Sequence, residues 1–128
     1  MASAKPRVIN PADAPPAPGP PTPGMDRRQL LDEEDRWIGW VQTTPGVAGG
    51  WHHHGDRDTF VFMTRGALVV EFGQGGSESI TLGAGEVGLI PPRTVHREIT
   101  TDDASAEAFV MRLGSGPQNV NVDAPDRE

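Results

Sequence analysis

Apolar and polar residues alternate in short runs along most of this chain, and turn-forming residues separate the runs. These runs predict strands at 37–43, 59–64, 67–72, 79–82, 87–90, 95–101 and 106–113. Turn signals recur about every 8–12 residues, which is typical of an all-β sandwich or barrel and not of βαβ units. We therefore expect an all-β fold. A short helix is expected at Asp26–Arg36, where good helix formers surround Leu30 and Leu31.

The two ends of the chain differ in composition from its middle. Proline is concentrated in 11–24, so residues 1–24 are predicted to be a flexible or polyproline-like N-terminal arm. The alternative is an arm that lies along a neighbouring subunit. Residues 25–116 form the expected domain, and the polar, acidic tail 117–128 is expected to fray.

Composition narrows the classes of function. A chain of 128 residues is one domain, and the absence of cysteine excludes disulfides, thiolate ligands and a cysteine nucleophile. Residues 1–24 lack the apolar segment of a secretory signal, and no apolar run is long enough to span a bilayer. We expect a cytoplasmic protein without a membrane partner. The net charge of −7 argues against nucleic acid, because phosphate binding needs a basic face.

All four histidines lie in two places, His52–His54 and His96. In a strand, residues two apart share a face, so His52 and His54 are predicted to point together while His53 points away. His96 on a second strand would complete a three-His face that leaves open positions for water or substrate. Such a site accepts a divalent transition metal: iron, manganese, nickel, zinc, cobalt or copper.

Other side chains are candidates for the surroundings of this centre. Glu98 shares a face with His96 and is a candidate fourth ligand or general acid/base, the alternative being a rim carboxylate. Arg112 is a candidate for binding a substrate carboxylate. Trp40 and Trp51 are more typical of a core or an interface than of a substrate platform. The predicted pocket wall, whose alternative is ordinary core, consists of Val61, Met63, Phe109 and Met111.

The histidines lie within two longer motifs. Five residues separate Gly46 from His52–His54, and Gly85 precedes a Pro-Pro-Arg turn that leads to His96. Over residues 25–116 this order resembles the cupin superfamily, whose members are small double-stranded β-helix, or jelly-roll, barrels. The resemblance implies that fold. It is weaker for function, because one fold hosts many activities.

Three positions depart from the cupin pattern. The family's metal-binding glutamate falls, counting back from Gly66, at Thr59, and Asp58 is one residue out of phase. A slip of one residue turns a strand side chain to the other face unless a bulge corrects it. The position of the fourth ligand is therefore open to three alternatives: Asp58 fills it, water replaces it, or it is absent. Asp58 is also a candidate auxiliary acid/base. Arg93 and Thr100 replace the glycine and asparagine of the second motif.

The resemblance also implies a class of activity. Cupins with three-His sites include non-haem iron dioxygenases, so we expect a metal-dependent enzyme, most simply an iron dioxygenase acting on a small chelating substrate. The alternatives are a non-catalytic module that binds metal or a small molecule, and a metal-free isomerase or epimerase. Small cupins commonly pair, so a homodimer is expected, with a small-molecule substrate as the other partner.

Overall fold

The computed structural model describes residues 5–125, and it is all-β, as predicted. Predictions for residues 1–4 and 126–128 lie outside the described residues. The strands are β1 (Met25–Asp32), β2 (Arg36–Thr43), β3 (His52–His53), β4 (Asp58–Arg65), β5 (Ala67–Phe72), β6 (Glu78–Gly83), β7 (Val87–Ile90), β8 (Arg97–Thr100), β9 (Ala106–Leu113) and β10 (Val120–Asn121). Two 3-10 turns lie at Pro11–Asp13 and Gln74–Gly76. No helix within the described residues could cross a membrane.

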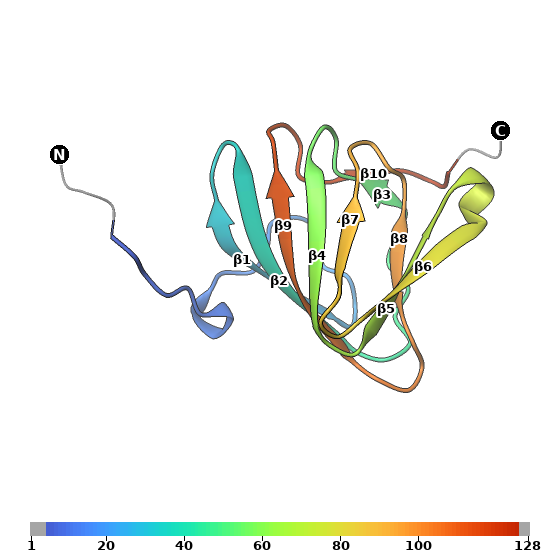
Figure 1. The fold of residues 1–128 in the computed structure, drawn as a ribbon, viewed down its shortest axis with the longest axis horizontal. Coiled ribbons are helices and arrows are strands. Elements are labelled where there is room, and N and C mark those ends of the chain that lie inside the picture. The colour runs from blue at the N-terminus through green and yellow to red at the C-terminus, as the bar shows by residue number, and fades with distance from the viewer. Residues whose placement is uncertain (1–4, 126–128) are drawn as a thin grey trace.

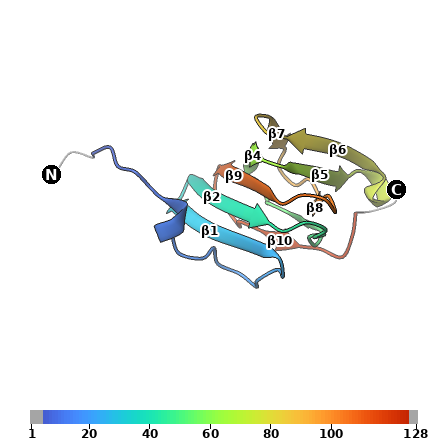
Figure 2. The same ribbon diagram turned by 90° about the horizontal axis from the view of Figure 1, so that it is seen from below.

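The strands form two larger antiparallel sheets and one strand pair. The first sheet has the order β1-β2-β9-β4-β7, the second has the order β6-β5-β8, and β10 pairs with β3. Figure 1 shows the strands of the first sheet side by side, with β5, β6 and β8 beyond β7. Seen from below, β1 and β6 lie at opposite sides of the fold (Figure 2). Sequence neighbours such as β4 and β5 are therefore split between the sheets by the turn at Gly66.

Strand alternation determines which side chains enter the core. Val61 and Met63 on β4 are 3 % and 1 % exposed, and Ala108 on β9 beside them is fully buried. The core cluster consists of Val61, Met63, Leu68, Val70, Leu82, Ile90, Ala106 and Ala108. Burying each of the larger side chains in this cluster contributes about 1.5–3 kcal/mol to the stability of the barrel.

The helix predicted at Asp26–Arg36 is wrong, because Met25–Asp32 is strand β1. β1 pairs with β2 over almost its full length, with Arg28 opposite Trp40. A weak local preference for helix gives way here to the hydrogen bonds that a neighbouring strand offers. The domain therefore gains an edge strand that the hydrophobic pattern did not reveal.

The proline-rich arm packs against this edge strand. The Ala17 N–H donates to the Arg27 carbonyl at 2.9 Å, and the Gln29 N–H donates to the Pro15 carbonyl at 2.8 Å. Ala14 is 8 % exposed. The part of the predicted arm nearest the domain thus covers the edge of β1, where unpaired backbone groups would otherwise face solvent.

Candidate metal centre

Two segments far apart in the sequence bring three histidines together. His52 lies on β3 and His96 directly precedes β8, and their backbones exchange hydrogen bonds of 3.0 and 2.9 Å. His54 follows β3, and one ring nitrogen from each of the three histidines lies within 4.8 Å of the others. His53 faces away and accepts a hydrogen bond from the Gly55 N–H at 3.0 Å. The predicted cluster of His52, His54 and His96 could therefore hold a metal ion.

Each of the three imidazoles is oriented by a backbone carbonyl. His52 Nδ1 lies 2.8 Å from the Gly50 oxygen, and His96 Nδ1 lies 2.8 Å from the Thr94 oxygen. His54 Nδ1 lies 2.8 Å from the Gln118 oxygen. A carbonyl only accepts, so each Nδ1 carries the proton and donates it. In the neutral form this leaves every Nε2 with a free lone pair, the arrangement that a metal site needs.

Glu98 completes the cluster with a carboxylate. Its Oε1 lies 3.2 Å from His96 Nε2, and its Oε2 lies 3.7 Å from His52 Nε2. The Glu98 side chain is 20 % exposed. Burial opposes its charge, but the hydrogen bond with His96 and the charges of His52 and His96 outweigh this effect and hold the pKa of Glu98 well below its usual range. The group is therefore an anion that faces the nitrogens of two candidate ligands.

The three histidines differ in how readily they accept a proton. Burial lowers the pKa of His54 to about 3, and the nearby charge of Arg112 adds to this effect. Burial also lowers the pKa of His52, against the attraction of Glu98. For His96 burial again opposes the charged form, but the hydrogen bond and charge of Glu98 prevail and raise its pKa. Two imidazoles are thus neutral and ready to bind a metal near neutral pH.

The carboxylate does not come from β4. Thr59 stands inside the barrel at 1 % exposure, with its Oγ1 lacking a hydrogen-bond partner among the described residues. Asp58 is exposed on the opposite face of β4. The candidate role of Asp58 as ligand or acid/base is therefore wrong, because β4 has no bulge at this position to turn it inward. Glu98 on β8 supplies the negative charge instead.

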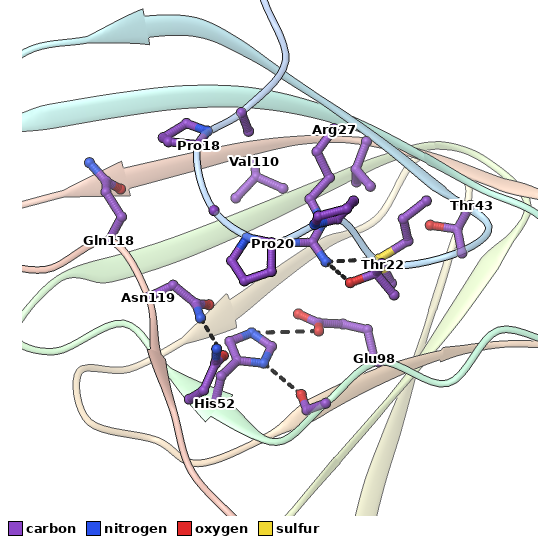
Figure 3. A pocket seen from close by; sticks show the side chains of 18 of the residues that line it. Pro18, Pro20, Thr22, Arg27, Thr43, His52, Glu98, Val110, Gln118 and Asn119 are labelled. Carbon is purple, nitrogen blue, oxygen red and sulfur yellow. Dashed lines mark hydrogen bonds and ion pairs between the residues drawn. The ribbon is translucent and has the colours of Figure 1, made fainter.

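A cavity of about 620 Å³ adjoins the cluster. Its wall includes His52, Val61, Leu68, Glu98, Val110 and Arg112, and segments from both ends of the chain close it. Figure 3 shows His52 and Glu98 in contact, with Pro18, Pro20 and Gln118 around the same space. Sequence reasoning did not identify the 17–22 and 118–122 segments as cavity walls, since nothing in their composition shows what they pack against.

Of the residues predicted for the pocket wall, Val61 and Arg112 line this cavity, whereas Met63, Phe109 and Met111 do not. Met63 is buried in the apolar core instead. Phe109 and Met111 lie on the outer face of β9, and Met111 is 41 % exposed. The sequence showed that side chains alternate along β9 but not which of them face inward. Ala106 and Ala108 point inward, and Val110 and Arg112 lie on the same face.

Arg112 presents a charged group to the cavity. Its guanidinium lies 4.4 Å from the centroid of the Trp37 ring, and its Nη1 lies 3.3 Å from Gln118 Oε1. Its buried Nε has no hydrogen-bond partner among the residues described. Burial lowers the pKa of Arg112 to about 10, so it stays charged at neutral pH. Arg112 therefore brings a positive charge to the cavity wall, where an anion would pair with it.

The loop before His96 is fixed by contacts with the first histidine motif, although Arg93 stands where the cupin motif has glycine. Arg93 has a φ of 59°, in the left-handed region that favours glycine. Its N–H donates to the Gly55 carbonyl at 2.8 Å, and its Nε lies 2.7 Å from an Asp56 carboxylate oxygen. These contacts tie the loop to the turn after His54, so the two histidine motifs support each other.

Comparisons with known proteins agree on the fold. The profile of the cupin domain matches residues 39–112, which include the whole candidate centre and Arg112. No curated protein matches the chain. KdgF from Halomonas sp. is similar in structure, with a TM-score of 0.69 and 18% identity over 86% of this chain and 96% of that one.

Two enzymes are also structurally similar. The polyketide cyclase RemF from Streptomyces resistomycificus has a TM-score of 0.73 and 16% identity, over 92% of this chain and 86% of that one. An oxalate oxidase in complex with the substrate analogue glycolate has a TM-score of 0.64 and 22% identity, over 79% of this chain and 57% of that one. At these identities the likeness shows the fold alone.

Proposed function

The chain belongs to the cupin domain family, and from that premise we propose that it is a metal-dependent enzyme acting on a small, anionic, chelating substrate. His52, His54 and His96 would bind the metal through Nε2, and Glu98 would be the fourth ligand. The observation that carries the proposal is the set of three Nδ1–carbonyl contacts, each 2.8 Å long. These contacts orient the three rings so that their other nitrogens, the Nε2 atoms, converge on one point. Such convergence is typical of metal ligands and is not required of imidazoles that are merely buried.

The donor set fits a divalent transition metal. Three imidazoles and one carboxylate suit iron, manganese, cobalt, nickel or zinc, and iron is expected for a dioxygenase. When bound, the metal would supply a Lewis acid and, if it is iron, redox chemistry with oxygen. The ionised carboxylate of Glu98 would offset part of the positive charge of the metal.

Arg112 would position the substrate. Its charge lies at the cavity wall that also contains Glu98 and His52. A substrate with two anionic groups would place one at the histidines and the other at Arg112, which fixes its orientation before reaction. The oxalate oxidase with glycolate supports this size and charge of ligand by analogy only.

The walls of the cavity would keep water away from the substrate. Pro18 and Pro20 on one side and Gln118 on another narrow the space next to His52 (Figure 3). Proline carries no N–H and has little freedom to move, so such a wall excludes water without competing for the substrate's oxygens.

Metal content of untagged protein tests the centre first. We expect about one metal ion per wild-type chain and a loss of at least about 100-fold in affinity for His96→Ala. His53→Ala is the matched control, because His53 lies in the same motif but faces away. Absence of metal in folded wild-type protein after supplementation with iron, manganese or zinc would refute the proposal.

Oxygen uptake with small 2-oxo and 2-hydroxy acids then tests the dioxygenase activity. Activity with iron that disappears with zinc would support it, and Arg112→Gln should raise KM more than it lowers kcat. Metal-loaded protein that binds these acids but turns over none of them, with any metal, would identify the non-catalytic module instead.

A further inference from the structure

Residues 114–122, which form a C-terminal strap, leave the end of β9 and return to the metal centre. Gly114 and Gly116 have φ values of 103° and 107°, in the left-handed region that favours glycine, and they let the chain turn after β9. Pro117 then packs on Gly55, where an added Cβ would lie 3.0 Å from the proline Cγ. The cupin profile ends at residue 112, so the strap lies outside the matched domain.

Gln118 of the strap contacts two parts of the proposed site. Its backbone carbonyl accepts a hydrogen bond from His54 Nδ1 at 2.8 Å, and its side-chain Oε1 accepts one from Arg112 Nη1 at 3.3 Å. The carbonyls that orient His52 and His96 lie only two residues before each ring, whereas the carbonyl that orients His54 lies 64 residues away. The orientation of His54 therefore depends on where the strap lies.

Arg57 fixes the strap beside the turn that follows His54. Its Nε and Nη2 both donate to the Gly116 carbonyl, at 3.1 and 3.0 Å. Its backbone N–H donates to the His54 carbonyl at 3.2 Å, and Asp58, the next residue, begins β4. Arg57 therefore links the strap to the His54 turn and to a strand that enters the apolar core.

The burial of Arg57 is unfavourable for the fold alone. Arg57 is 4 % exposed, and the Gly116 carbonyl is the one acceptor that its guanidinium contacts among the described residues. Burying a charge without a carboxylate partner opposes stability, and an apolar side chain of similar volume often replaces a buried charged group at no loss. The benefit of an arginine at this position therefore lies in what it holds, which is the strap.

We propose that Arg57 is a positioning residue of the metal centre, which holds the C-terminal strap so that the Gln118 carbonyl orients His54 toward the other two histidines. The assignment rests on the proposed function only for the role of His54 as a metal ligand. Removing a group that orients a metal ligand lowers metal affinity about 10–100-fold. Arg57 acts on His54 through the strap, so we expect a loss near the lower end of that range.

Arg57→Met in the full chain tests the assignment, because methionine fills much of the same volume but removes the donors to Gly116. Its metal affinity should fall about 10-fold in competition with a chelator, whereas its urea midpoint without metal should not fall. Arg65→Met is the matched control. It makes the same substitution at the other end of β4, where the arginine side chain is 56 % exposed, and should change neither value.

The His54 ring in metal-free protein separates this assignment from the proposed function. Nitrogen NMR of the wild type should show the His54 proton on Nδ1, and Arg57→Met should move part of the population to the form protonated on Nε2. His52 and His96, whose carbonyl partners are local, should keep their Nδ1 protons in both proteins. Wild-type protein that binds no metal would refute the proposed function, and the His54 ring would still decide the role of Arg57.

A His54 ring that keeps its Nδ1 proton in folded Arg57→Met would overturn the assignment, whatever the metal affinity. A metal affinity equal to that of the wild type would overturn it too, and so would an equal loss in Arg65→Met. Should Arg57→Met fail to fold, Arg57→Lys takes its place. Lysine keeps the charge but lacks the fork that binds Gly116 through two N–H groups, so metal affinity should fall at least about 3-fold with the same change at His54.

Discussion

The metal centre and the apolar core are neighbours inside one barrel but depend on different interactions. The core consists of side chains such as Val61, Met63 and Val70, which strand alternation turns inward and which need no particular partner. The centre consists of polar groups, and each imidazole has its own backbone carbonyl. The core therefore determines how stable the barrel is, and the centre determines what it binds.

The largest expected effect separates the two faces of one sheet. Met63→Ala should lower the free energy of unfolding by about 2–5 kcal/mol, because Met63 is 1 % exposed and its removal leaves a cavity. Met111→Ala, on the outer face and 41 % exposed, should cost less than about 1 kcal/mol in dilute protein. Urea unfolding of both variants measures the difference, and equal losses would contradict the assigned inner and outer faces.

Glu98→Gln should affect binding far more than folding. We expect metal affinity to fall about 100-fold, or about 2.7 kcal/mol, because the amide removes the charge that faces His52 and His96. Competition with a chelator of known affinity measures this. Asp58→Asn, which removes an exposed charge from the outer face of β4, should leave the affinity unchanged. A loss in both variants would show a general charge effect.

The stability of the metal-free protein should decrease as the pH is lowered, because of His54. In the unfolded chain His54 takes up a proton near pH 6.5, whereas in the folded protein its pKa is about 3. Between these values the unfolded state binds more protons, so the free energy of unfolding decreases by up to ~1.4 kcal/mol per pH unit as pH falls.

His96 works in the opposite direction, since its pKa is raised. Its contribution is present in full below about pH 6.5 and is lost as pH rises through its folded-state pKa. Urea unfolding of wild type and His54→Asn at a series of pH values separates the two. An unchanged slope in His54→Asn would contradict a neutral, buried His54.

The smallest expected effect lies in the loop between the histidine motifs. Arg93→Gly should be about 1 kcal/mol more stable than Arg93→Ala, because both lose the Asp56 contact but only glycine relieves the φ of 59°. Thermal unfolding of the two variants measures this. If alanine is as stable as glycine, the left-handed conformation costs nothing at this position.

Local sequence patterns predicted most of the strands and the histidine cluster, because both depend on the two-residue alternation of side chains along a strand. Seven predicted runs correspond to β2 and β4–β9, and the spacing of His52, His54 and His96 predicted the cluster. β1 was expected to be a helix, because its pairing with β2 and the covering segment near Ala17 are contacts between separate elements. No local pattern shows such contacts.

The position of Glu98 illustrates the same limit. Its spacing from His96 showed that the two share a face, but not that its carboxylate would lie beside the nitrogens of both His96 and His52. For β9 the alternation was visible, yet only packing against β4 shows that Val110 and Arg112 face inward and Phe109 outward. Where both faces of a sheet are apolar, hydrophobicity alone cannot assign the inner one.

The sequence by itself determined the all-β class, the cupin motifs and the identity of the three imidazoles, because strand period and ligand chemistry are properties of neighbouring residues. Tertiary structure alone decided which carboxylate joins them, which face of β9 lines the cavity, and that segments 17–22 and 118–122 close it. Those outcomes depend on the packing of residues distant in sequence, and that packing is set by the whole barrel.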